Sequence, residues 1–189
     1  MKRCIAILFS LCALTTVCAQ SGTTTYNLTL TGSQILPPIS DPSVGEAFLL
    51  VSFNTDSNNI TYQLVADSVT ELLVAHIHLP ATSSMNGSVA IPLFQAQFDP
   101  IPGSTTSGLI AAATVTPATF VGPLEVLPDF TNVDVPTVLS EYVQQGRAYA
   151  QIHTMPYPDG ALRAEFDSSL VVSGNPPTPT LMAPITVVI

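Results

Sequence analysis

Short segments in which apolar and polar residues alternate constrain the fold of this 189-residue chain more than any other feature. In segment 24–31, Tyr26, Leu28 and Leu30 occupy every second position, which is the spacing of a strand with one buried face. Seventeen prolines and ten glycines are spread along the chain, and both residues interrupt long helices. The pattern therefore predicts an all-β protein of short strands joined by turns.

About seven or eight such segments follow one another, with turn residues between them. We expect strands at 24–31, 46–54, 59–67, 72–78, 88–94, 108–115, 147–154 and 161–166. Pro92 places the fifth of these at a sheet edge or a bulge, because proline cannot donate a ladder hydrogen bond. One short helix is expected at 135–145. Strands of this number and spacing predict an antiparallel β-sandwich or barrel.

Both ends of the chain are expected to lie outside this domain. Residues 1–19 combine a basic start at Lys2 and Arg3 with a short apolar run and small residues up to Ala19, the pattern of a secretory signal peptide. An uncleaved membrane anchor is the alternative. Residues 168–189 hold a proline-rich polar linker and an apolar end. This tail is either a plain or edge-strand extension or a signal for a lipid anchor of the glycosylphosphatidylinositol type.

Removal of the signal peptide would change the charge and the redox chemistry of the chain. All three cysteines lie within it, so the mature domain would hold no disulfide. Two cations, Arg147 and Arg163, would remain against thirteen acidic residues. Such a surface disfavours nucleic acid and anionic membranes as partners, and it favours divalent cations or basic partners.

Three asparagines stand in Asn-x-Ser/Thr sequons: Asn27, Asn59 and Asn86. In a secreted eukaryotic chain, these residues are candidate N-glycosylation sites on exposed edges or loops. Together with the signal peptide, they predict a secreted glycoprotein that is attached to the cell surface only if the tail is processed to a lipid anchor.

The three histidines of the chain are His76, His78 and His153. His76 and His78 would point to the same side of their strand, because side chains alternate along a strand. Such a pair, with a third histidine from a distant strand, fits zinc or copper ligation with an open position. The alternative is structural: the imidazoles would hold strand ends together by hydrogen bonds to the backbone and to neighbours such as Asp159, Arg163 and Glu165.

Arg163 and Glu165 alternate with Leu162, Ala164 and Phe166 in the last expected strand. The charged pair and the apolar residues would therefore face opposite sides of the sheet. A buried guanidinium is costly to leave unpaired, so we expect a structural ion pair between Arg163 and Glu165. The alternative is an anion anchor beside the histidines.

Two motifs give the chain a family resemblance. Ala-His-Ile-His-Leu-Pro-Ala at 75–81, and Gly-Arg-Ala-Tyr-Ala-Gln-Ile-His-Thr at 146–154 with the hairpin at 157–166, resemble the two signatures of the CHRD domain of chordin and of secreted microbial proteins. The resemblance spans about residues 24–167 and implies an extracellular module with an immunoglobulin-like β-sandwich or barrel. Leu79 departs from a usual glycine and Ala161 from a usual acidic residue, which leaves Glu165 as the partner of Arg163.

The sequence favours a binding module over an enzyme. It contains no Gly-x-Ser-x-Gly elbow and no phosphate loop, which are the motifs of common catalytic sites. We expect an extracellular binding or scaffolding domain whose partner is an extracellular protein or a wall or matrix component, with no certain cofactor. The alternative is a three-histidine zinc- or copper-binding domain, or a metalloenzyme on a sandwich similar to copper/zinc superoxide dismutase. The paired-metal site of that enzyme needs more than the three histidines of this chain. It also needs a disulfide, which the mature chain cannot make.

Overall fold

The computed structural model of the protein is a β-sandwich, which confirms the expected all-β antiparallel fold. It describes residues 22–79, 86–115 and 145–167, together with 139, 142–143, 171–172 and 186–188. The described strands are β1 (Thr23–Leu30), β2 (Glu46–Asn54), β3 (Asn59–Thr70), β4 (Leu72–Leu79), β5 (Ser88–Gln95), β6 (Thr105–Val115), β7 (Tyr149–Thr154), β8 (Leu162–Glu165), β9 (Val171–Val172) and β10 (Thr186–Val188). Two 3-10 turns, η1 (Gly32–Gln34) and η2 (Pro42–Val44), lie between β1 and β2.

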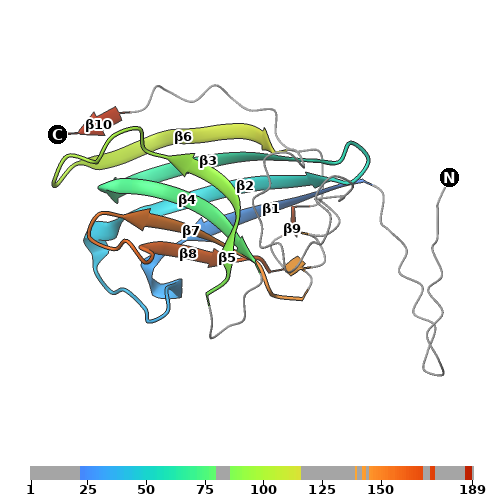
Figure 1. The fold of residues 1–189 in the computed structure, drawn as a ribbon, viewed down its shortest axis with the longest axis horizontal. Helices are drawn as coiled ribbons and strands as arrows, with labels where there is room; N and C mark the ends of the chain where they lie inside the picture. Colours follow the sequence, from blue (N-terminus) through green and yellow to red (C-terminus); the bar gives the residue numbers. More distant parts are fainter. Residues whose placement is uncertain are drawn as a thin grey trace.

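The strands form two antiparallel sheets that pack face to face (Figure 1). The larger sheet has the order β10-β6-β3-β2-β1-β9, and the smaller sheet has the order β5-β4-β7-β8. The chain changes sheets between β3 and β4. In the smaller sheet, the two central strands β4 and β7 are neighbours, and these strands carry the histidines.

The core forms because the inward face of each main strand is lined with apolar residues. Tyr26, Leu28 and Leu30 of β1 are all buried, as the alternation predicts. At one end of the sandwich, Tyr26 packs edge-on against Phe53 and Phe166, with ring centres 5.4 and 5.5 Å apart. Such edge-to-face pairs add to the stability that burial of the rings provides. These contacts join β1 and β2 to the segment that follows β8.

Proline in β5 fits its place at the edge of the smaller sheet. Pro92 is exposed and lies opposite His76, next to a shift in the register between β4 and β5. An edge strand has one side without a neighbour in its sheet, so a missing donor is tolerated there. The prediction of an edge or bulge at Pro92 is therefore confirmed.

Several strand boundaries differ from the predicted ones. β6 begins at Thr105 rather than at Gly108, because Thr105 and Thr106 pair with the end of β3 beyond a bulge. Within the segment expected to be a short helix, the described residues Leu139, Tyr142 and Val143 are helical. The expected signal peptide and the proline-rich linker at 173–180 lie outside the described residues. Beyond residue 167, β9 pairs with β1 and β10 pairs with β6.

Among the residues described, none forms a helix long and apolar enough to cross a bilayer.

Candidate metal centre

The three histidines lie on the outer face of the smaller sheet. His76 and His78 are on β4, and His153 is on the neighbouring strand β7, opposite Val74. Ala75 and Ile77 point the other way and are buried in the core. Strand alternation and register together therefore gather the three imidazoles, although 75 positions separate His78 from His153 in the sequence.

The imidazoles form a compact triangle. The ring centres are 5.6 Å apart for His76 and His78, 5.4 Å for His76 and His153, and 5.9 Å for His78 and His153. One ring nitrogen of each histidine lies within 4.8 Å of one in each of the others. Tetrahedral ligation at about 2.0–2.1 Å would set the nitrogens roughly 3.3 Å apart. The nitrogens would therefore have to approach one another by up to about 1.5 Å to bind one ion.

Backbone carbonyls fix the orientation of two of the three rings. The Nδ1 atom of His78 lies 3.0 Å from the carbonyl oxygen of Gly87, and Nδ1 of His153 lies 2.8 Å from that of Pro158. Because a carbonyl oxygen only accepts, each Nδ1 is the donor and each Nε2 of the neutral ring carries a lone pair. Protein metal sites hold their histidines in this way, through the nitrogen that does not bind the ion.

Three further ring nitrogens, one on each histidine, are buried but have no hydrogen-bond partner among the described residues. They are His76 Nδ1, His78 Nε2 and His153 Nε2. Buried polar atoms in folded proteins are nearly always hydrogen-bonded, so each exception requires an explanation. One unpartnered nitrogen per histidine, in a triangle of this size, is the donor set that a transition-metal ion would use.

Burial keeps two of these histidines neutral at physiological pH. The pKa of His78 is lowered to about 4, first by burial and then by the nearby His76, His153 and Arg163, while the bond to Gly87 opposes this shift. The pKa of His76 is also lowered to about 4, by burial and by His153. A metal ligand must be unprotonated, so these imidazoles need not lose a proton to bind an ion.

Arg163 and Tyr149 adjoin the histidines on the same face. Arg163 is 1% exposed, and its Nη2 lies 3.0 Å from Oε1 of Glu165. Its guanidinium carbon lies 3.7 Å from the centre of the Tyr149 ring, which is stacked on His78 at 4.8 Å. Burial raises the pKa of Tyr149, so its hydroxyl stays protonated. The expected partner of Arg163 is thus beside it, together with contacts that the sequence did not suggest.

Among the described residues, the hydrogen bonds expected of the structural alternative are made to backbone carbonyls. Carbonyls of Gly87 and Pro158 accept from the imidazoles, whereas Arg163 and Glu165 pair with each other. Tyr149 is not among the site residues predicted from the sequence, although its position four residues before His153 places it on the same strand face. No sequence signal identifies the two carbonyls, because every residue has one.

The sequon asparagines occupy different surroundings. Asn27 is exposed on β1, and Asn59 is half-buried at the start of β3. Asn86 is exposed, and its Oδ1 accepts a hydrogen bond of 3.0 Å from Arg163 Nη1. Glycosylation of each remains a prediction.

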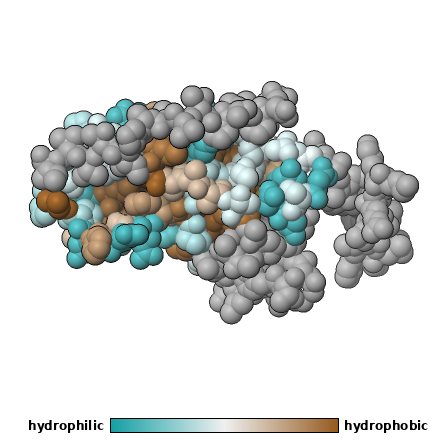
Figure 2. Space-filling view, turned by 90° about the horizontal axis from the view of Figure 1, so that it is seen from above, coloured by the Kyte–Doolittle hydropathy of each residue, from teal (hydrophilic) through white to brown (hydrophobic). Residues whose placement is uncertain are grey.

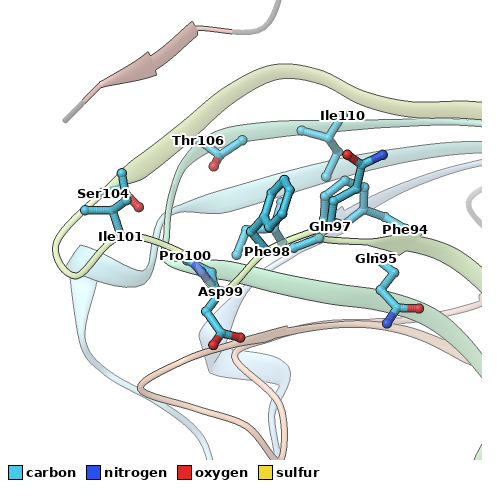
Figure 3. A pocket seen from close by; sticks show the side chains of 12 residues that line it. Phe94, Gln95, Gln97, Phe98, Asp99, Pro100, Ile101, Ser104, Thr106 and Ile110 are labelled. Atoms are coloured by element: carbon cyan, nitrogen blue, oxygen red, sulfur yellow. The ribbon is translucent and has the colours of Figure 1, made fainter.

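A cavity, separate from the histidine cluster, lies where the loop after β5 meets the start of β6. The cavity has a volume of about 520 Å³ and is lined mainly by apolar groups, among them Phe94, Phe98 and Ile110 (Figure 3). The side chain of Phe98 is 84% exposed. Viewed from above, apolar surface is visible between polar residues (Figure 2). None of the histidines lines this cavity.

Comparisons with known proteins agree with the two sequence motifs. The family model of the CHRD domain matches residues 26–166, a segment that contains the three histidines and the Arg163–Glu165 pair. No curated protein and no solved structure matches the chain.

Proposed function

The chain belongs to the CHRD domain family, and we propose that it is a module that binds one zinc or copper ion between His76, His78 and His153. One observation carries this proposal: each histidine has a buried ring nitrogen without a partner among the described residues, and these residues form one cluster of candidate ligands. Three imidazoles and one open position form a known set for both metals.

The overall charge of the chain supports binding of a cation. The chain supplies thirteen acidic residues, whose summed field attracts positive ions. The carboxylate of Glu165 pairs with Arg163, and the candidate ligands that cluster among the described residues are the three histidines, which offer nitrogen donors. Nitrogen donors of this kind favour zinc and copper over magnesium and calcium, which prefer oxygen.

The decisive experiment measures the metal content of protein that carries no histidine tag. We expect about one equivalent of zinc or copper after loading and dialysis. His153→Ala is expected to lose it, whereas Glu46→Gln, which removes an exposed carboxylate instead, is expected to retain it. Less than about a tenth of an equivalent in the unaltered protein contradicts the proposal.

The proposed site of action is extracellular. The supporting observations are the signal-like residues 1–19 and the three sequons. Expression in a eukaryotic secretory host should release a protein that begins at Gln20 and loses mass on treatment with a glycosidase. Retention of residues 1–19 in the product would contradict secretion by this route.

The apolar cavity favours a second role, the extracellular binding function that the family motifs imply. Its volume of about 520 Å³ lies in the range of pockets that hold small ligands. A hydrophobic fluorescent dye should bind the native protein, and Phe98→Ser should weaken this binding at unchanged thermal stability. Equal dye binding by the variant and by the unaltered protein would exclude the cavity as the binding site.

A further inference from the structure

A buried arginine next to the histidines has more contacts than an ion pair requires. Nη1 of Arg163 donates to Oδ1 of Asn86 at 3.0 Å, and Nη2 donates to Glu165 at 3.0 Å. The guanidinium also lies over the ring of Tyr149, at 3.7 Å from its centre. Glu165 is half-exposed, and ion pairs that water reaches contribute little. The ion pair alone therefore does not explain why the arginine is buried here.

Tyr149 connects this arginine with the proposed metal site. The strand order β4-β7-β8 places Tyr149 between His78 and Arg163. Its ring is parallel to that of His78 within 6°, at 4.8 Å. The three side chains thus form a column in which the cation packs on one side of the tyrosine and the histidine on the other.

A second route from Arg163 to His78 runs through the segment before β5. Asn86 is held by Arg163, and the next residue, Gly87, accepts the Nδ1 proton of His78. The amide of Gly87 also donates to the hydroxyl of Tyr149 at 3.1 Å. Both supports of His78, the stacked ring and the carbonyl, therefore depend on contacts with the same guanidinium.

We propose that Arg163 is a positioning residue of the metal site, which holds His78 in its orientation and tautomer through Asn86 and Tyr149. This inference rests on the proposed metal-binding function. Partners that orient a ligand histidine typically change metal affinity by about 10- to 100-fold when they are removed. Glu165, whose carboxylate accepts a hydrogen bond from Arg163 and gives no direct support to the imidazole of His78, should matter much less.

The first test compares the zinc affinity of matched variants by competition with a chromophoric chelator. Arg163→Gln and Asn86→Ala are expected to bind zinc about 10- to 100-fold more weakly than the unaltered chain. Glu165→Gln, the control that removes only the ion pair, should stay within about threefold. Asn86 is exposed, so Asn86→Ala preserves the core and decides the question if Arg163→Gln does not fold.

The second test uses metal-free protein, so it does not depend on metal binding. Long-range nitrogen–proton NMR should show one Nδ1–H tautomer for His78 in the unaltered chain and in Glu165→Gln. Asn86→Ala and Arg163→Gln should show averaging between the two tautomers. An unchanged tautomer in both, or an effect of Glu165→Gln as large as theirs, would overturn the positioning role. Absence of zinc binding by the unaltered chain, with the tautomers as expected, would refute the metal site alone.

Discussion

Acidification of the metal-free protein is predicted to destabilise it well above the pH at which carboxylates titrate. The pKa of His78 is about 4 in the folded protein, whereas a histidine in an unfolded chain has a pKa near 6.5. The fold therefore favours the neutral ring. The resulting stability is complete above pH 6.5 and is lost as the pH falls from about 6.5 towards about 4.

The size of this effect follows from the two pKa values. At pH 5.0, His78 is almost fully protonated in the unfolded chain and largely neutral in the fold, which corresponds to about 2 kcal/mol of lost unfolding free energy. His78 is 6% exposed, so solvent screening reduces this value little. The pKa of His76 is shifted in the same direction, so it adds to the loss. Asp41, whose pKa its bonds to Ser43 hold below 3.8, stays charged throughout this range.

The assay is urea unfolding at pH 7.5 and pH 5.0 after removal of metal by a chelator. The unaltered protein should lose about 2 kcal/mol or more between the two conditions. His78→Gln, which carries a neutral side chain that does not titrate, should lose about 2 kcal/mol less. Equal losses in the two proteins, or a stability that does not fall at pH 5.0, would refute the assignment of a buried neutral His78.

Two further predictions concern the scaffold. Gly160→Ala should destabilise the protein by about 3 kcal/mol, because φ is +136° there and the new Cβ would overlap Nε2 of Gln151. Gly103→Ala, at φ +76° with open space around it, should cost only about 1 kcal/mol by the same urea titration. Tyr62→Phe should lower the unfolding free energy by about 1 kcal/mol in that assay, since the buried hydroxyl donates to the carbonyl of Leu93 in the other sheet. Equal stability of Gly160→Ala and Gly103→Ala, or no loss in Tyr62→Phe, would contradict these readings.

The fold was predictable because its signal is local. Alternation along β1 and β3 directly identifies buried residues such as Tyr26 and Ile60. Turn residues mark where one strand ends and the next begins. The start of β6 was not predictable in this way. Thr105 and Thr106 resemble loop residues, and they become strand only because the end of β3 pairs with them across a bulge. Such pairing is a tertiary effect that overrides local preference.

The candidate site was predictable in its ligands but not in its supports. Strand alternation places His76 and His78 together, and the presence of a third histidine in the chain suggests His153. The three histidines come together only because β4 and β7 are neighbouring strands, and the sequence pattern does not predict this pairing. The carbonyls of Gly87 and Pro158 are set by the paths of two loops. Residue type carries no information about them.

X-ray absorption spectroscopy of the metal-loaded protein tests the central claim most directly. For zinc, we expect three imidazole nitrogens at about 2.0–2.1 Å and one further light atom in the open position. His153→Ala, loaded at excess zinc, should lose one imidazole from the count. A spectrum dominated by oxygen donors, or fewer than two imidazoles per zinc in the unaltered protein, would contradict a site built from His76, His78 and His153.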